Sequence, residues 1–103
     1  MTTEKILSQT LTGTGTTDEA TVASYRNILF QYTVTGISGT VVVLAEGSND
    51  GSNWFNIDEN GATSITTDGT GALQLSNTAL EQVRFNWSSG SATSIEVDIN
   101  GNR

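Results

Sequence analysis

The sequence has no cysteine, no histidine and no proline among its 103 residues. Without cysteine the chain can form no disulfide, thiolate nucleophile or cysteine-ligated metal site, and its redox compartment is left open. Without histidine it lacks an imidazole base, an imidazole metal ligand and a side chain that titrates near neutral pH. Catalysis would have to rely on carboxylates, hydroxyls or Lys5. Because no suitable base accompanies the many Ser and Thr hydroxyls, we expect the chain not to be an enzyme.

Positive charge and long apolar runs are also scarce. Four Lys and Arg residues stand against eleven acids, which gives a formal net charge of −7. Binding to a phosphate backbone or to an anionic membrane needs clustered bases, so the sequence predicts neither nucleic acid nor a membrane as a partner. The longest apolar run, residues 41–45, is far shorter than the roughly 20 residues that span a bilayer. The first residues do not resemble a signal peptide, which favours a protein made in the cytoplasm.

Apolar and polar residues alternate with a period of two along much of the chain, as in strands with one buried face. The expected strands cover residues 6–11, 28–35, 40–46, 54–58, a short segment around Ile65, 73–75, 83–88 and 95–100. Residues 18–25 are compatible with a short helix capped by Asp18 or with a strand. Seven to nine short strands predict an all-β fold, an antiparallel two-sheet β-sandwich of jelly-roll-like type. We expect one domain over residues 1–103, with 1–17 as an alternative extended N-terminal arm.

Two of these strands carry specific expectations. Residues 41–44 are apolar on both faces, which predicts a central strand or one covered by a partner. Phe30 with Tyr32, and Phe85 with Trp87, alternate properly and are expected in the core. If the last two strands pair across a turn at 88–91, Arg84 can lie beside Glu96 or Asp98.

A hairpin is predicted where the turn-forming run at 47–53 separates two apolar segments. Its return strand begins with Trp54 and Phe55, whose side chains should point to opposite faces. One ring is then expected in the core and the other outward, close to Asn53 and Asp50, unless a neighbouring sheet or loop covers both. An exposed aromatic ring beside amides and carboxylates can stack on a sugar or anchor a protein interface.

Acidic residues offer two further candidate sites. Asp58 and Glu59 are adjacent, and a pair of carboxylates is the minimum for glycoside hydrolysis, but neighbours on a strand point to opposite faces and cannot flank one bond. Asn49, Asp50, Asp58 and Asp68 lie near turns and carry oxygen ligands that suit calcium, without the spacing of a helix-flanked calcium loop. The glycine-rich segments at 13–15 and 68–71 are not followed by a lysine and a helix, so they are turns. The sequence therefore predicts no catalytic residue, no metal and no cofactor.

The motif Glu-Gly-Ser-x-Asp-Gly-x-x-Trp at 46–54, followed by Val-Arg-Phe at 83–85, resembles small β-sandwich structural proteins of tailed bacteriophages. The resemblance extends over residues 28–100. It implies a decoration (cement) protein of the capsid, or part of a head fibre or tail, located in the virion. It also implies a homotrimer whose partners are its own copies and the major capsid protein or another virion protein. The competing interpretation is a carbohydrate-binding module that uses Trp54 or Phe55 as its stacking platform.

Overall fold

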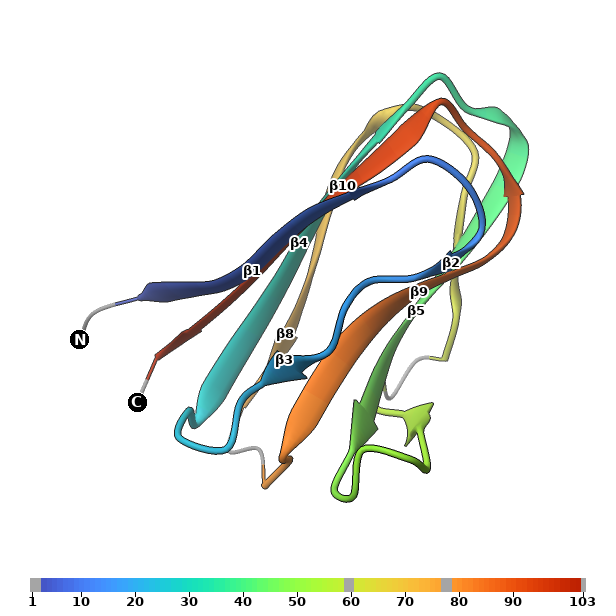
Figure 1. Cartoon of the computed structure of the whole chain (residues 1–103). Coiled ribbons are helices and arrows are strands. Elements are labelled where there is room, and N and C mark those ends of the chain that lie inside the picture. The colour runs from blue at the N-terminus through green and yellow to red at the C-terminus, as the bar shows by residue number, and fades with distance from the viewer. Residues whose placement is uncertain (1–2, 59–60, 77–78, 103) are drawn as a thin grey trace.

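The computed structural model describes residues 3–58, 61–76 and 79–102, and these residues form two antiparallel sheets packed face to face (Figure 1). The strands are β1 (Glu4–Leu11), β2 (Gly15–Thr16), β3 (Ala20–Thr21), β4 (Asn27–Thr35), β5 (Ser38–Ser48), β6 (Phe55–Asn56), β7 (Thr63–Ile65), β8 (Gly69–Leu75), β9 (Gln82–Ser91) and β10 (Ser94–Asn102). The prediction of an all-β, two-sheet sandwich is confirmed. Among the described residues, no helix is long and apolar enough to cross a membrane.

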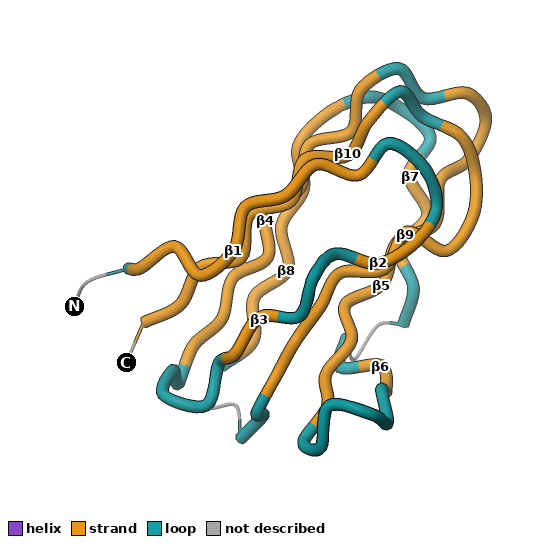
Figure 2. The backbone as a smooth tube through the Cα atoms, in the orientation of Figure 1, coloured by secondary structure: helices purple, strands orange, loops and turns teal. Residues whose placement is uncertain are grey.

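The chain passes repeatedly from one sheet to the other. The four-stranded sheet has the order β1-β10-β4-β8, and the second sheet has the order β2-β9-β5-β6, with β3 also on β9 and β7 also on β5. The long strands that follow each other along the chain therefore alternate between the two sheets. The loops that join them gather at two ends of the sandwich (Figure 2). The described residues form ten strands instead of seven to nine, because β2 and β3 have two residues each and are too short to show an alternation.

The core lies between the two sheets and consists of the inward positions that the alternation predicts. The fully or nearly buried apolar side chains of the long strands include Ile28, Phe30, Val34, Val41, Val43, Ala45, Val83, Phe85, Trp87, Ile95, Val97 and Ile99. Phe30 and Phe85 meet across the sheets, with 6.5 Å between their ring centroids. Tyr32 also packs on Phe85, at 5.3 Å, but is only half-buried because its neighbour β8 is the last strand of the sheet.

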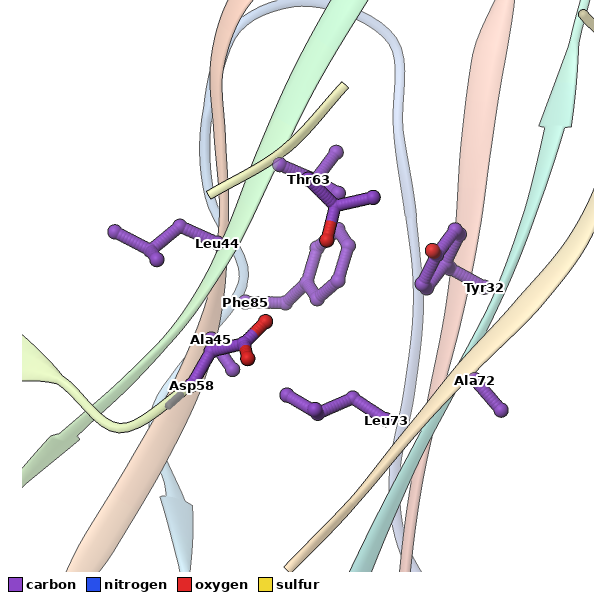
Figure 3. Close-up of a pocket in the computed structure, with 9 residues that line it drawn as sticks. Tyr32, Leu44, Ala45, Asp58, Thr63, Ala72, Leu73 and Phe85 are labelled. Carbon is purple, nitrogen blue, oxygen red and sulfur yellow. The ribbon is translucent and has the colours of Figure 1, made fainter. Parts of the chain in front are cut away.

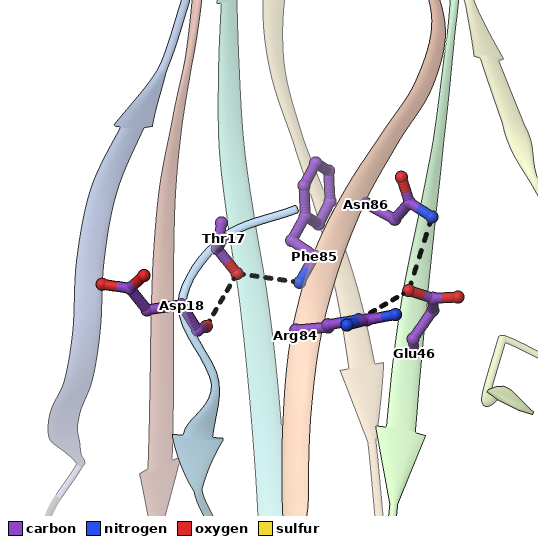
Figure 4. A network of polar contacts seen from close by, with 6 residues as sticks. All are labelled: Thr17, Asp18, Glu46, Arg84, Phe85 and Asn86. Atoms are coloured by element: carbon purple, nitrogen blue, oxygen red, sulfur yellow. Dashed lines mark hydrogen bonds and ion pairs between the residues drawn. The ribbon is translucent and has the colours of Figure 1, made fainter. Parts of the chain in front are cut away.

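The pairing of the last two strands was predicted wrongly. Residues 88–91 belong to β9 and not to a hairpin turn, and β9 and β10 lie in different sheets. Arg84 therefore faces Glu46 of β5, with 2.9 Å between Nε and Oε1 (Figure 4). Asp98 lies 3.6 Å from Lys5 of β1. Strands that follow each other along the chain usually pair within one sheet, whereas β9 and β10 face each other across the core.

The N-terminal segment contributes to both sheets. β1 pairs with β10 from Glu4 to Leu11, and the following residues cross to β9 in the second sheet. There Thr17 is buried, and its hydroxyl accepts a hydrogen bond from the backbone N–H of Phe85 at 3.0 Å and donates one to the carbonyl of Asp18 (Figure 4). Gln9 accepts a hydrogen bond from the N–H of Asp18 and so joins β1 to this crossing. The ambiguous segment at 18–25 forms the short strand β3 and no helix.

Candidate functional site

The predicted hairpin between β5 and β6 is held by a compact set of hydrogen bonds. The buried Ser48 hydroxyl accepts from the N–H groups of Asp50 and Gly51 and donates to the Asp50 carboxylate. That carboxylate accepts from the N–H groups of Ser52 and Asn53, both at 2.8 Å, and from the Asn53 side-chain amide at 2.7 Å. Asx and Ser turns of this kind satisfy the backbone groups that a loop would otherwise leave to water. The hairpin loop is therefore ordered by its own side chains.

Loss of the Asp50 carboxylate is expected to loosen this hairpin. The N–H groups of Asn53 and Ser52, followed by the side chains of Asn53 and Ser48, hold the pKa of Asp50 well below its usual value. Because folding lowers this pKa, the ionised carboxylate stabilises the folded protein at pH values above the unfolded pKa of about 3.9. This stabilisation is lost as the pH falls through the folded pKa. Asp50→Ala should therefore accelerate amide exchange at Ser52 and Asn53, and the difference from the parent protein should persist to about pH 4 and shrink only below it.

Asp68 provides the matched control for this measurement. Its carboxylate accepts hydrogen bonds from the N–H groups of Ile37 and Gly36, which lower its pKa in the same way at a different turn. Asp68→Ala should accelerate exchange at Gly36 and Ile37 and leave the hairpin amides unchanged. Unchanged exchange of Ser52 and Asn53 in Asp50→Ala would show that the carboxylate does not order the loop.

The two aromatic residues after the turn occupy different surroundings. Trp54 is half-buried beneath the Arg84 guanidinium, whose central carbon lies 4.1 Å from the ring centroid, and Arg84 in turn pairs with Glu46. Phe55 is 47% exposed. The expectation that one ring enters the core is wrong, because neither ring belongs to the core cluster. The space above Gly47, the β5 residue that pairs with Phe55, is occupied by Ile57 and Leu80. Phe55 is the outward ring, close to Asn53 and Asp50 in sequence.

Asp58 lines a cavity of about 140 Å³ at the open side of the sandwich, between β8 and the edge of the second sheet (Figure 3). Its side chain is 8% exposed and points toward the same space as the hydroxyls of Tyr32 and Thr63. Burial raises the pKa of Tyr32, and the nearby Asp58 carboxylate raises it further, so the phenol stays a hydrogen-bond donor. Asp58 is the one carboxylate among the described lining residues, whereas glycoside hydrolysis needs two. Glu59, the other half of the predicted pair, lies outside the described residues.

Three of the four candidate calcium ligands bind backbone groups at separate places, and the fourth, Asp58, lines the cavity. Asn49 accepts a hydrogen bond from the N–H of Glu81, and Asp50 and Asp68 each accept hydrogen bonds from backbone N–H groups at a turn. Within the described parts of the chain, no three acidic side chains come close enough to hold a metal ion. The cavity was not predicted from the sequence, because Thr63 belongs to a three-residue strand and Tyr32 was expected in the core. The sequence held one weak indication of the cavity. Gly71 pairs with Tyr32 in the sheet, and a glycine has no side chain that could cover the Tyr32 ring.

The fold and the ordered hairpin define a small β-sandwich with an exposed aromatic residue at one end. No protein-family model and no curated protein sequence matches the chain. Among solved structures, it is similar to the SPBc2 prophage-derived protein YomS, with a TM-score of 0.66 and 13% identity over 97% of this chain and 90% of that chain. It is also similar to a chain of the structure described as "Bacillus endospore appendages form a novel family of disulfide-linked pili", with a TM-score of 0.53 and 8% identity over 98% and 87% of the two chains. These likenesses show a shared fold.

Proposed function

We propose that this chain is a non-enzymatic structural subunit of a phage-derived particle, and specifically a decoration protein of the head. The observation that carries the proposal is the likeness to a prophage-derived protein along nearly the whole of both chains. The likeness to a pilus chain supports a role in assembly, and the motif at 46–54 supports the phage origin independently of either structure. The homotrimer implied by the sequence resemblance is an alternative that the mass of the protein in solution tests.

The hairpin supplies the attachment point in this proposal. Phe55 is a large exposed apolar side chain at the start of β6, next to a loop that Asp50 and Ser48 already hold in one conformation. An ordered loop loses little conformational entropy on binding, and an aromatic residue that fits a pocket can supply much of the binding energy. Trp54 is less suited to this role, because Arg84 covers one face of its ring.

Replacing Phe55 with serine is expected to weaken attachment to heads without unfolding the protein. Removing an aromatic anchor from an interface costs about 2 kcal/mol or more, which is a loss of about 30-fold or more in affinity. The measurement is co-sedimentation of the purified protein with heads of the phage that encodes it, beside the thermal unfolding of each variant. Gln31→Ala, an exposed position on the other sheet, is the control and should bind as the parent does.

Three outcomes would count against the proposal. If the parent protein sediments only with tails, the role in the head is wrong while the structural role stands. If it sediments with neither heads nor tails, the structural role is wrong as well. Binding to a glycan array that is lost in Phe55→Ser, with no binding to particles, would instead favour a carbohydrate-binding module.

A further inference from the structure

The outer strands of the four-stranded sheet differ in how well they are protected against pairing with another chain. β1 carries Glu4 and Lys5 and has a register shift between Lys5 and Leu7, and charges and irregularities of this kind discourage edge-to-edge pairing. β8 (Gly69–Leu75) has no charge, no proline and a regular register with β4 over all seven residues. The second sheet presents only fragments of two or three residues at its edges. β8 is thus the long, regular and uncharged edge among the described strands.

The backbone of β8 has unused hydrogen-bonding groups on its outer side. Its sheet partner is β4 alone, and in an antiparallel pair alternate residues point their N–H and C=O groups away from that partner. In the described part of the chain, the backbone hydrogen bonds outside the strand ladders include none from residues 69–75. The side chains alternate between exposed and half-buried, so the strand lies at the surface. Such an edge is a template for one more antiparallel strand.

We propose that β8 pairs with β8 of a second copy of this chain, antiparallel and centred on Ala72. This register places Gly69 opposite Leu75, Thr70 opposite Gln74 and Gly71 opposite Leu73, with Ala72 opposite its own copy. No charge faces another charge, although each copy carries a net charge of −7. The strand pairing therefore adds no local charge repulsion to that between the two acidic copies, and the contact is a two-fold one in which both copies use the same surface. The two four-stranded sheets become one continuous sheet.

Ala72 allows a charge-exchange test of this contact. The side chain is exposed, its register partner in β4 is Gln31, and it points away from the cavity (Figure 3). Ala72→Lys places two ammonium groups opposite each other and Ala72→Glu places two carboxylates there, and like charges directly opposite destabilise a strand pair. We expect the parent protein to sediment as a dimer, each variant alone as a monomer, and an equimolar mixture of the two variants as a dimer again.

The controls separate this contact from a general effect of charge and from the proposed function. Ala72→Lys changes the net charge from −7 to −6, and this smaller net charge would by itself favour association. If the dimer is lost in this variant, the cause is therefore the repulsion between the two lysines at the contact. Ser8→Lys makes the same change at an exposed position of β1 and should leave the dimer intact. Added salt should strengthen the parent dimer, because it screens the repulsion between the two acidic copies. Phe55→Ser should leave the protein dimeric in solution, since the hairpin is not part of this contact.

The measurement is the mass in solution by sedimentation equilibrium, from micromolar to millimolar protein, with amide exchange of residues 69–75 as a second readout. Protection of alternate amides in β8 at high concentration supports the contact. A parent protein that is monomeric throughout, or trimeric, overturns the proposal, and so does a mixture of the two variants that fails to recover the dimer. The experiment needs no phage particle, so its failure leaves the proposed attachment to heads unaffected.

Discussion

Replacing Trp87 with alanine is expected to lower the free energy of unfolding by about 3–5 kcal/mol. The side chain is 1% exposed in the centre of β9, where it faces the core beside Val43 of β5. Its indole N–H also donates a hydrogen bond to the carbonyl of Ser89 at 3.1 Å, which would be left without this donor. Domains of this size have a total stability of only about 5–15 kcal/mol, so the variant should be close to unfolding at physiological temperature. The measurement is equilibrium denaturation in urea.

Phe55→Ala is the matched control for this loss, because it also removes an aromatic ring but from the surface. A half-exposed side chain that is absent from the core cluster should cost less than about 1 kcal/mol. Trp87→Phe, which keeps most of the volume and loses the N–H, should lie between the two. Equal losses in Trp87→Ala and Phe55→Ala would contradict the placement of Trp87 at the centre of the core.

Alternation was enough to predict the long strands and most of their buried positions. It placed Phe30, Phe85 and Trp87 in the core, because a side chain on a half-buried strand has only two faces to choose from. It could not predict which strands become neighbours, since alternation says nothing about the sheet to which a strand belongs. The wrong partner for Arg84 follows directly from that limit: Glu46 lies 38 positions earlier in the chain and is adjacent only because β9 pairs with β5.

In the candidate site too, contacts between residues close in sequence could be predicted, and contacts between distant residues could not. The hairpin and its turn residues could be predicted, because Ser48, Asp50 and Asn53 form hydrogen bonds with one another and with backbone within a few positions. The position of Trp54 could not, because it depends on a cation from another strand. The cavity lined by Asp58 and Tyr32 also escaped prediction, since it arises where the edges of two sheets face each other.

Gly90→Ala should be among the most damaging small substitutions, with an expected loss of about 2–5 kcal/mol. Gly90 lies in β9 with a φ of +93°, which costs a non-glycine residue about 1–2 kcal/mol. A Cβ there would also overlap the carbonyl oxygen of Thr40 and lie 2.7 Å from the Cα of Val41. Both are backbone atoms of β5 and cannot turn away as a side chain would. Forcing them apart should add about 1–3 kcal/mol and disturb the irregular register between β5 and β9 at this point.

Two other glycines separate these two contributions. Gly39 has a φ of +80° with no atom within 4 Å of the Cβ position, so Gly39→Ala should show the backbone cost alone. Gly13 has open space and no positive φ, so Gly13→Ala should be neutral or stabilise by up to about 1 kcal/mol through the unfolded state. Urea denaturation should therefore rank the losses as Gly90, then Gly39, then Gly13. If Gly90→Ala is no worse than Gly39→Ala, β5 and β9 are not packed as closely at this end as the structure shows, and the sandwich must be more open where the chain turns from β9 into β10.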